Sequence, residues 1–112
     1  METISWSDFE QVELRVGRII GAEIFTGARS PAYILQVDFG EEIGVKKSSA
    51  QITELYTPEE LQGRLVVGVV NFPRKQIGPL MSECLITGFH NREGVVALCV
   101  PDQEVPLGAK LC

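Results

Sequence analysis

The chain has 112 residues, which predicts one domain over residues 1–112, large enough to bury its own core without disulfides or metals. Hydrophobic residues make up 45% of the sequence and charged residues 22%, a globular composition that argues against disorder. The net charge of −5 argues against a general polyanion binder, but the pairs Lys46-Lys47 and Arg74-Lys75 have no acidic neighbours and predict a local basic surface.

The cysteines and the apolar segments indicate the compartment. Cys84, Cys99 and Cys112 are far apart and odd in number, which favours neither a disulfide framework nor a zinc site. The first ten residues have no basic start and no apolar core, so they do not resemble a signal peptide. The longest apolar run, residues 65–70, is too short to span a bilayer. We therefore expect a reduced, cytoplasmic protein that does not insert into membranes.

The first elements are a short helix and a long strand. Ser5 or Ser7 is a candidate N-cap for a helix through Asp8 and Phe9. From residue 12 the sequence alternates with period two, which predicts a strand with one buried face. Gly17 and Gly21 predict bends or bulges in this strand. The predicted buried residues are Leu14, Val16, Ile20, Ala22 and Ile24.

Further apolar segments predict four or five more strands. A turn at residues 28–31 precedes a strand marked by Tyr33, Leu35, Val37 and Phe39, and residues 40–42 turn into a third strand over residues 43–50. Thr57-Pro58-Glu59-Glu60 predicts a short helix over residues 57–62, with an N-cap, a proline at the first helical position and a capping box. The remaining prediction is a strand over residues 64–70, a loop over 71–79, strands over 84–89 and 95–100, and an extended tail over 101–112.

The order of these elements predicts the fold. Three strands, one helix and two strands is the layout of an all-β, five-stranded Greek-key barrel, the OB-fold, here with an added N-terminal helix and C-terminal tail. Another small closed barrel is the alternative. A parallel α/β fold is not expected, because the one clear helix is too short for repeated crossovers.

The sequence carries no catalytic motif. His90 is the only histidine and has no cysteine or acid at ligand spacing. Glu59 and Glu60 are explained as acids at a helix N-terminus. No nucleotide, hydrolase or metalloprotease motif is present, so we expect a protein that is not an enzyme and has no catalytic residue, metal or cofactor.

Two segments have the composition of a binding surface. Residues 46–53 combine two lysines with hydroxyls and an amide, although a polar edge strand that prevents aggregation has the same composition. Residues 71–78 fill the loop between the fourth and fifth strands, which binds ligands in OB-folds. In this loop Arg74 and Lys75 supply charge, and Phe72 either stacks on a base or belongs to the core.

Several motifs together resemble a known family. Eight segments are similar to the tRNA-binding-domain family, and to its CsaA-type subgroup in particular. They are residues 8–19, 28–33 and 37–40, Lys46 to Thr53, Val70 to Pro73, Lys75 to Gly78, Ser82-Glu83 and Val105 to Gly108. The resemblance covers nearly the whole chain. It implies an OB-fold homodimer that binds tRNA or acts as a chaperone-like factor on export-bound precursor proteins. Carried over by position, its binding residues are Lys46, Lys47, Ser48, Ser49, Asn71, Lys75 and Ser82.

Two functions follow as hypotheses. The first is a chaperone-like factor that binds unfolded precursor proteins and also tRNA; the alternative is a dedicated tRNA-binding module with no chaperone role. A homodimer is expected because the N-terminal segment carries Ile4, Trp6 and Phe9 and the tail carries Val105, Leu107 and Leu111. The alternative use of these apolar residues is to fold back onto their own barrel.

Overall fold

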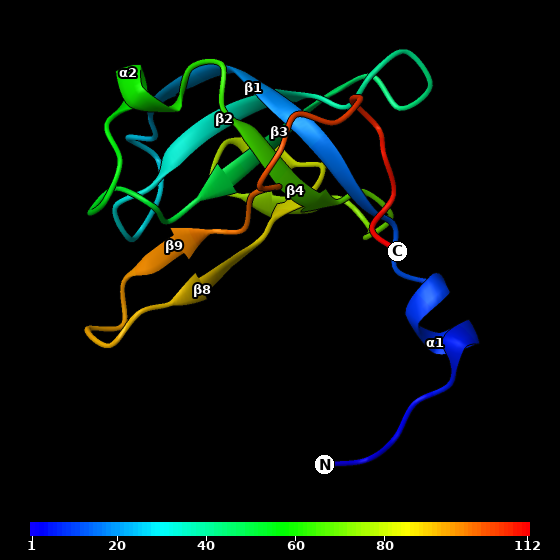
Figure 1. Cartoon of the computed structure of the whole chain (residues 1–112). Coiled ribbons are helices and arrows are strands. Elements are labelled where there is room, and N and C mark those ends of the chain that lie inside the picture. Colours follow the sequence, from blue (N-terminus) through cyan, green and yellow to red (C-terminus); the bar gives the residue numbers. More distant parts are fainter.

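A twisted antiparallel sheet forms most of the molecule, in the strand order β3-β2-β1-β4-β7. The computed structural model describes all residues 1–112, and Figure 1 shows the sheet curling into a nearly closed barrel. The OB-fold prediction is confirmed. In chain order the elements are α1 (Trp6–Glu10), β1 (Leu14–Ile24), β2 (Tyr33–Asp38), β3 (Val45–Ala50), α2 (Pro58–Leu61), β4 (Leu65–Val69), β5 (Lys75–Ile77), β6 (Leu80–Ser82), β7 (Leu85–Ile86), β8 (Gly88–His90) and β9 (Val96–Leu98).

The long strand β1 pairs with β4 along its first half and with β2 along its second half. The predicted buried face is wrong at two positions, since Ile20 and Ile24 are exposed and Ile19 is fully buried. Before the bulge that the register shift between Ile19 and Gly21 marks, the odd positions Gly17 and Ile19 face the core, so Ile20 points outward. After the bulge the inward parity changes and Ala22 packs on the core, while Ile24 is exposed at the end of the strand.

The extended tail lies against the part of β1 that β2 leaves unpaired. The Val16 amide donates to the Ala109 carbonyl, the Gly108 amide donates to Val16, and the Leu111 amide donates to Leu14. The tail backbone therefore pairs with its own barrel, while the Leu111 side chain stays exposed. Pairing of this kind protects an edge that would otherwise expose unpaired backbone groups.

The barrel interior is filled around one aromatic ring. Phe39 is 1% exposed and packs against Gly17 and Gly68, where a Cβ atom would come within 2.8 and 2.9 Å of the ring. Leu61 of α2 is fully buried in the same core. The predicted capping box of α2 is present, with Thr57 and Glu60 each accepting from the other's backbone amide.

The two edge strands of the sheet, β3 and β7, are not joined by a ladder. Closure instead occurs at the segment just before β7. The Glu83 amide donates to the Lys47 carbonyl at 2.8 Å, and the Lys47 amide donates to Glu83 Oε1 at 2.9 Å. The Glu83 side chain thus takes the place of a backbone acceptor, and we call this junction the seam.

Two predicted elements differ in detail. Residues 71–79, predicted as a loop, contain β5 and the turn that joins it to β6, which begins at Gly78 with a φ of 55°. The predicted strand over residues 84–89 is divided into β7 and β8 at Thr87, whose amide and hydroxyl both donate to the Val67 carbonyl. Because of this break, β8 pairs with β9 in a hairpin that leaves the barrel on the same side as the N-terminal arm (Figure 1).

Candidate binding cleft

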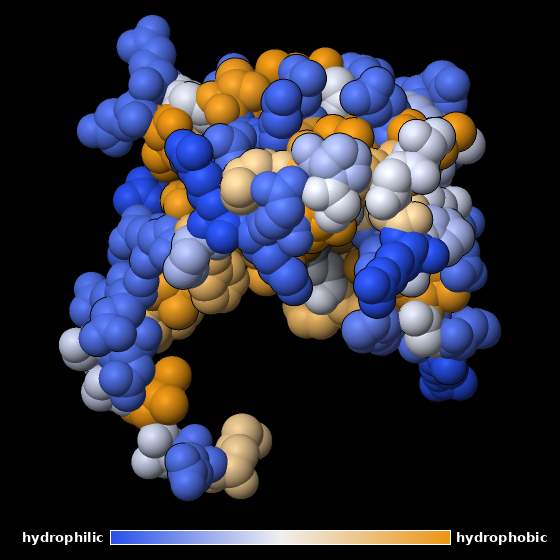
Figure 2. All heavy atoms as spheres, turned by 180° about the vertical axis from the view of Figure 1, so that it is seen from behind, coloured by the Kyte–Doolittle hydropathy of each residue, from blue (hydrophilic) through white to orange (hydrophobic).

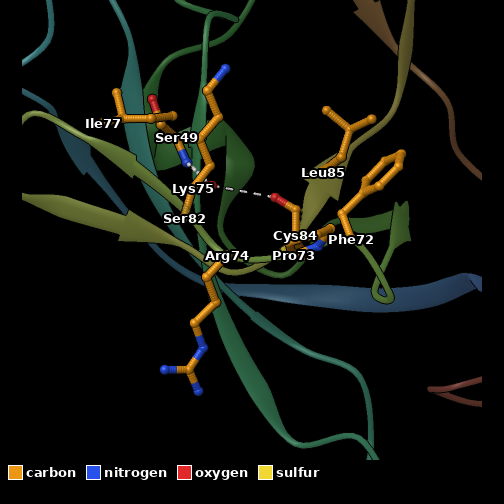
Figure 3. A pocket seen from close by; sticks show the side chains of 9 residues that line it. All are labelled: Ser49, Phe72, Pro73, Arg74, Lys75, Ile77, Ser82, Cys84 and Leu85. Atoms are coloured by element: carbon orange, nitrogen blue, oxygen red, sulfur yellow. Dashed lines mark hydrogen bonds between the residues drawn. The ribbon is translucent and has the colours of Figure 1, made fainter.

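A cleft of about 460 Å³ lies beside the seam, between the end of β3, the segment that leads into β5, and the start of β7. Figure 3 shows Phe72 and Leu85 at one end of it and Lys75 with two serines at the other, while Arg74 points away from both groups. Its lining therefore combines an apolar part with a polar, cationic part. The nine lining residues are Ser49, Phe72, Pro73, Arg74, Lys75, Ile77, Ser82, Cys84 and Leu85.

The cleft brings together residues that are distant in the sequence. Of the residues predicted to bind, Ser49, Phe72, Arg74, Lys75 and Ser82 line it. The two serines are joined at its floor, where the Ser49 amide donates to Ser82 Oγ at 3.4 Å. The β5–β6 hairpin and β3 therefore present these side chains on one surface, which matches the ligand-binding side of OB-folds.

Strand β3 divides the Lys46–Ser49 group between its two faces. Ser48 is 1% exposed and lies in the barrel interior with Ala50. Lys46 shares that face by strand periodicity and is half-buried. Lys47 and Ser49 are on the opposite, outer face, and Lys47 is exposed. The structure thus places Lys47 beside the cleft-lining Ser49, and does not bring Lys46 or Ser48 to the cleft lining.

Asn71 is exposed, but its side chain is engaged away from the cleft. Its Nδ2 donates to the Gln11 carbonyl at 2.7 Å, and its Oδ1 accepts from the Glu13 amide at 3.1 Å. Both partners belong to the segment that joins α1 to β1. The Asn71 amide therefore ties this segment to the end of β4 and does not line the cleft.

The apolar part of the cleft is exposed to solvent. Phe72 is 54% exposed and Leu85 is 50% exposed, so the alternative that Phe72 is a core residue is wrong. Sequence reasoning missed Leu85 and Cys84 as lining residues, and also Pro73 and Ile77, although these two lie inside the predicted binding segment. Half-exposed apolar side chains that meet in one cleft gain free energy when a ligand covers them.

The electrostatics of the cleft are locally positive. Lys47 and Lys75 form no salt bridge, and Arg74 Nη2 lies 3.9 Å from Glu83 Oε2. Arg74 is 71% exposed, so this pair contributes little to stability. Three cations thus face one carboxylate near the cleft, in a protein whose net charge is −5.

The thiol at the base of the cleft is unreactive. Burial raises the pKa of Cys84 to about 11, and the nearby Lys46 ammonium opposes this shift only partly. A thiol with so high a pKa carries almost no thiolate near neutral pH, and the thiolate is the nucleophile. Cys84 therefore serves the cleft as a small apolar side chain. Cys99 is half-buried and Cys112 is exposed.

No helix of the protein has both the length and the apolar character required to cross a membrane.

Comparison with known proteins gives the family. Residues 14–110 match the tRNA binding domain family. Methionine–tRNA ligases match too: that of Pyrococcus horikoshii is 37% identical over 111 residues, and ligase 1 of Bacillus anthracis is 36% identical over 111 residues. These matches cover 99% and 98% of this chain but only 15% and 16% of the ligases.

Solved structures match this chain and are themselves covered over their full length. Chaperone CsaA from Bacillus anthracis strain Ames is 44% identical with a TM-score of 0.92, covering 99% of this chain and 100% of that one. CsaA from Picrophilus torridus is 43% identical with a TM-score of 0.91, covering 98% and 100%. A MetRS-related protein from Pyrococcus horikoshii is 28% identical with a TM-score of 0.87, covering both chains fully. The chain therefore belongs to the tRNA-binding-domain family and is of the CsaA type.

Proposed function

We propose that the protein is a chaperone-like binding module whose cleft holds an extended, unfolded segment of an export-bound precursor protein. The observation that carries this proposal is the pair of half-exposed side chains, Phe72 and Leu85, at one end of an open 460 Å³ cleft. Such a surface suits apolar side chains of an unfolded chain, and the net charge of −5 favours a protein ligand over a general polyanion. The three unpaired thiols agree with the cytoplasm, the reducing compartment in which we place the protein.

A second candidate ligand is tRNA, and a different observation favours it. Lys47, Arg74 and Lys75 extend from the outer face of β3 and from the β5 side of the cleft, and two of them form no salt bridge. Cations of this kind attract phosphates, and Phe72 beside them offers a ring on which an unpaired base stacks. In this case the protein acts as a tRNA-binding module in trans and has no chaperone role.

Salt separates the two ligands, because phosphate binding weakens steeply with salt and burial of apolar surface does not. We expect a urea-unfolded secretory precursor, diluted into buffer, to bind with similar affinity at low and moderate salt in a filter-binding titration. Bulk tRNA should lose affinity over the same range. The double variant Lys47→Glu/Lys75→Glu should lower the slope of log K against log salt by about 1.4 to 1.8, from about 0.7 to 0.9 for each lost phosphate contact.

The outcomes of this titration distinguish the candidates. Binding of tRNA alone, with a slope that the two lysine substitutions reduce, would establish the tRNA module and reject the chaperone role. A matched variant, Arg92→Glu, changes an exposed cation at the turn between β8 and β9, outside the cleft. It should leave the slope unchanged. If it lowers the slope as much as Lys75→Glu does, the phosphate contacts are not at the cleft.

We also propose that the protein is a homodimer paired through its N-terminal arm, residues 1–12. Trp6 is 77% exposed and Ile4 is 70% exposed, and the Trp6 and Phe9 rings pack edge to face at 6.2 Å. Figure 2 shows the arm reaching away from the barrel, with apolar atoms on it and a hollow between arm and barrel. Large apolar side chains are unfavourable in water by about 1.5 to 3 kcal/mol each, and a two-fold axis buries both copies at once.

The mass in solution tests the dimer. Light scattering at micromolar concentration should give twice the chain mass of 12.3 kDa. The variant Trp6→Ala should shift the equilibrium towards monomers, because it removes the largest apolar side chain of the arm. A parent mass of one chain at every concentration would refute the dimer.

A further inference from the structure

Helix α1 is short and exposed, yet both of its ends are capped. At its start the Ser5 hydroxyl accepts from the Asp8 amide, and the Asp8 carboxylate accepts from the Ser5 amide. It has five residues and no buried side chain. Helices of this length are not stable in water by themselves, because nucleation is unfavourable and packing normally supplies the stability.

The C-terminal end of α1 is capped by the barrel. The Glu10 carbonyl accepts from Lys110 Nζ at 2.9 Å, and the Gln11 carbonyl accepts from Asn71 Nδ2 at 2.7 Å. Carbonyls in the last turn of a helix have no partner within the helix, and a cation near them is favourable. Two barrel side chains, one from the end of β4 and one from the tail, therefore supply the missing donors.

The same two side chains also hold Glu13, the residue just before β1. Asn71 Oδ1 accepts from the Glu13 amide at 3.1 Å, and Lys110 Nζ lies 3.0 Å from Glu13 Oε2. Asn71 and Lys110 thus each bind the chain on both sides of the turn between α1 and β1. Two anchors on either side of a turn fix its direction, which one contact does not.

We propose that Asn71 is a positioning residue that sets the direction in which the N-terminal arm leaves the barrel, so that Trp6 and Phe9 meet a second copy of this chain already oriented. This inference rests on the proposed dimer. An arm held in its bound direction before association has less conformational freedom to lose, and this strengthens binding without any new contact between the copies. Asn71 touches no residue of the partner in this scheme and acts only through the arm.

The test compares two asparagines that each make two hydrogen bonds. Asn71→Ala removes the bond to Gln11 in the arm and the bond to Glu13 just before β1, and leaves the two contacts of Lys110 in place. Asn91→Ala also removes two hydrogen bonds, which Asn91 Oδ1 accepts from the Glu93 and Val95 amides in the turn of the β8–β9 hairpin. Trp6 is the only tryptophan, so its fluorescence anisotropy reports arm motion directly. The other readouts are exchange of the Glu13 amide proton, the dimer dissociation constant and the melting temperature of the barrel.

In Asn71→Ala we expect faster decay of Trp6 anisotropy in dilute monomer, about tenfold faster Glu13 amide exchange, and about tenfold weaker dimerisation, from the loss of two neutral hydrogen bonds. The barrel should melt at the temperature of the parent. Asn71→Asp keeps the acceptor for the Glu13 amide but loses the donor to the Gln11 carbonyl, so its arm readouts should fall between those of the parent and those of Asn71→Ala. It also provides the test if the alanine variant misfolds. Asn91→Ala should behave as the parent in every arm readout.

Two outcomes would overturn the positioning role. One is parent-like anisotropy and Glu13 exchange in Asn71→Ala and Asn71→Asp; the other is an equal effect of Asn91→Ala on the arm. If the parent itself is a monomer, the proposed dimer fails, and the presentation of Trp6 and Phe9 to a second copy fails with it. Anisotropy and exchange in that monomer still decide separately whether Asn71 sets the direction of the arm.

Discussion

Replacing Phe72 with alanine should weaken binding of an unfolded precursor by about tenfold or more, at low and moderate salt alike. Phe72 is the largest apolar side chain of the cleft and is 54% exposed when the cleft is empty. Covering a large apolar side chain contributes about 1.5 to 3 kcal/mol, and each 1.4 kcal/mol changes a dissociation constant tenfold. The measurement is the same filter-binding titration, repeated with the variant at both salt concentrations.

The matched control is Phe89→Ala. Phe89 is 69% exposed on β8, outside the cleft, so its replacement by alanine removes the same apolar side chain at another place on the surface. It should leave precursor affinity within about twofold of the parent. Equal losses from Phe72→Ala and Phe89→Ala would show that unfolded chains adhere to apolar surface in general, and would remove the cleft from the proposed function.

The largest expected effect on stability is at Phe39. Replacement with alanine should lower the free energy of unfolding by about 3 to 5 kcal/mol, because the ring is 1% exposed and the two glycines beside it have no side chain to fill the cavity. Chemical denaturation measures this change. A loss below about 1 kcal/mol would mean that the ring does not fill the barrel as described.

The glycines beside Phe39 give a sharper form of the same prediction. A Cβ at Gly17 would lie 2.5 Å from Val37 Cγ1 and 2.8 Å from Phe39 Cδ1, so Gly17→Ala should cost about 1 to 3 kcal/mol by overpacking. Gly21→Ala, on the same strand, meets only Gln36 at 3.5 Å and should be nearly neutral. In the double variant Gly17→Ala/Phe39→Leu, the smaller leucine side chain leaves room for the new Cβ. The loss of unfolding free energy should therefore be smaller than the sum of the losses in the two single variants.

Elements with local signals were predictable from the sequence. Thr57, Pro58 and Glu60 lie within four residues and specify the start of α2 without help from the rest of the chain. Gly21 signals the bulge in β1, but which face of the strand points inward before it depends on pairing with β4 and β2, so Ile20 was placed on the wrong face. The β5–β6 hairpin was missed because its strands are too short to show alternation, although Gly78-Pro79 marked its turn.

The cleft was predictable where its residues are contiguous. Phe72, Arg74 and Lys75 belong to one segment and reach the cleft together, whereas Leu85 joins them only because β7 pairs with β4. Strand periodicity already separates Lys47 from Lys46, since neighbours in a strand face opposite sides. The engagement of Asn71 with residues about sixty positions away depends on tertiary structure and has no local signal.

The seam gives the barrel an uneven mechanical character. Around most of the barrel, paired strands separate only when several hydrogen bonds break together. At the seam, Lys47 and Glu83 are joined by one backbone bond and one side-chain bond. A thermal fluctuation therefore needs less free energy to open the seam than to separate two strands of a ladder. The cleft lies beside this seam, and Ser49 and Ser82 belong both to its lining and to the strands that meet there, so an opening of the seam displaces a wall of the cleft first.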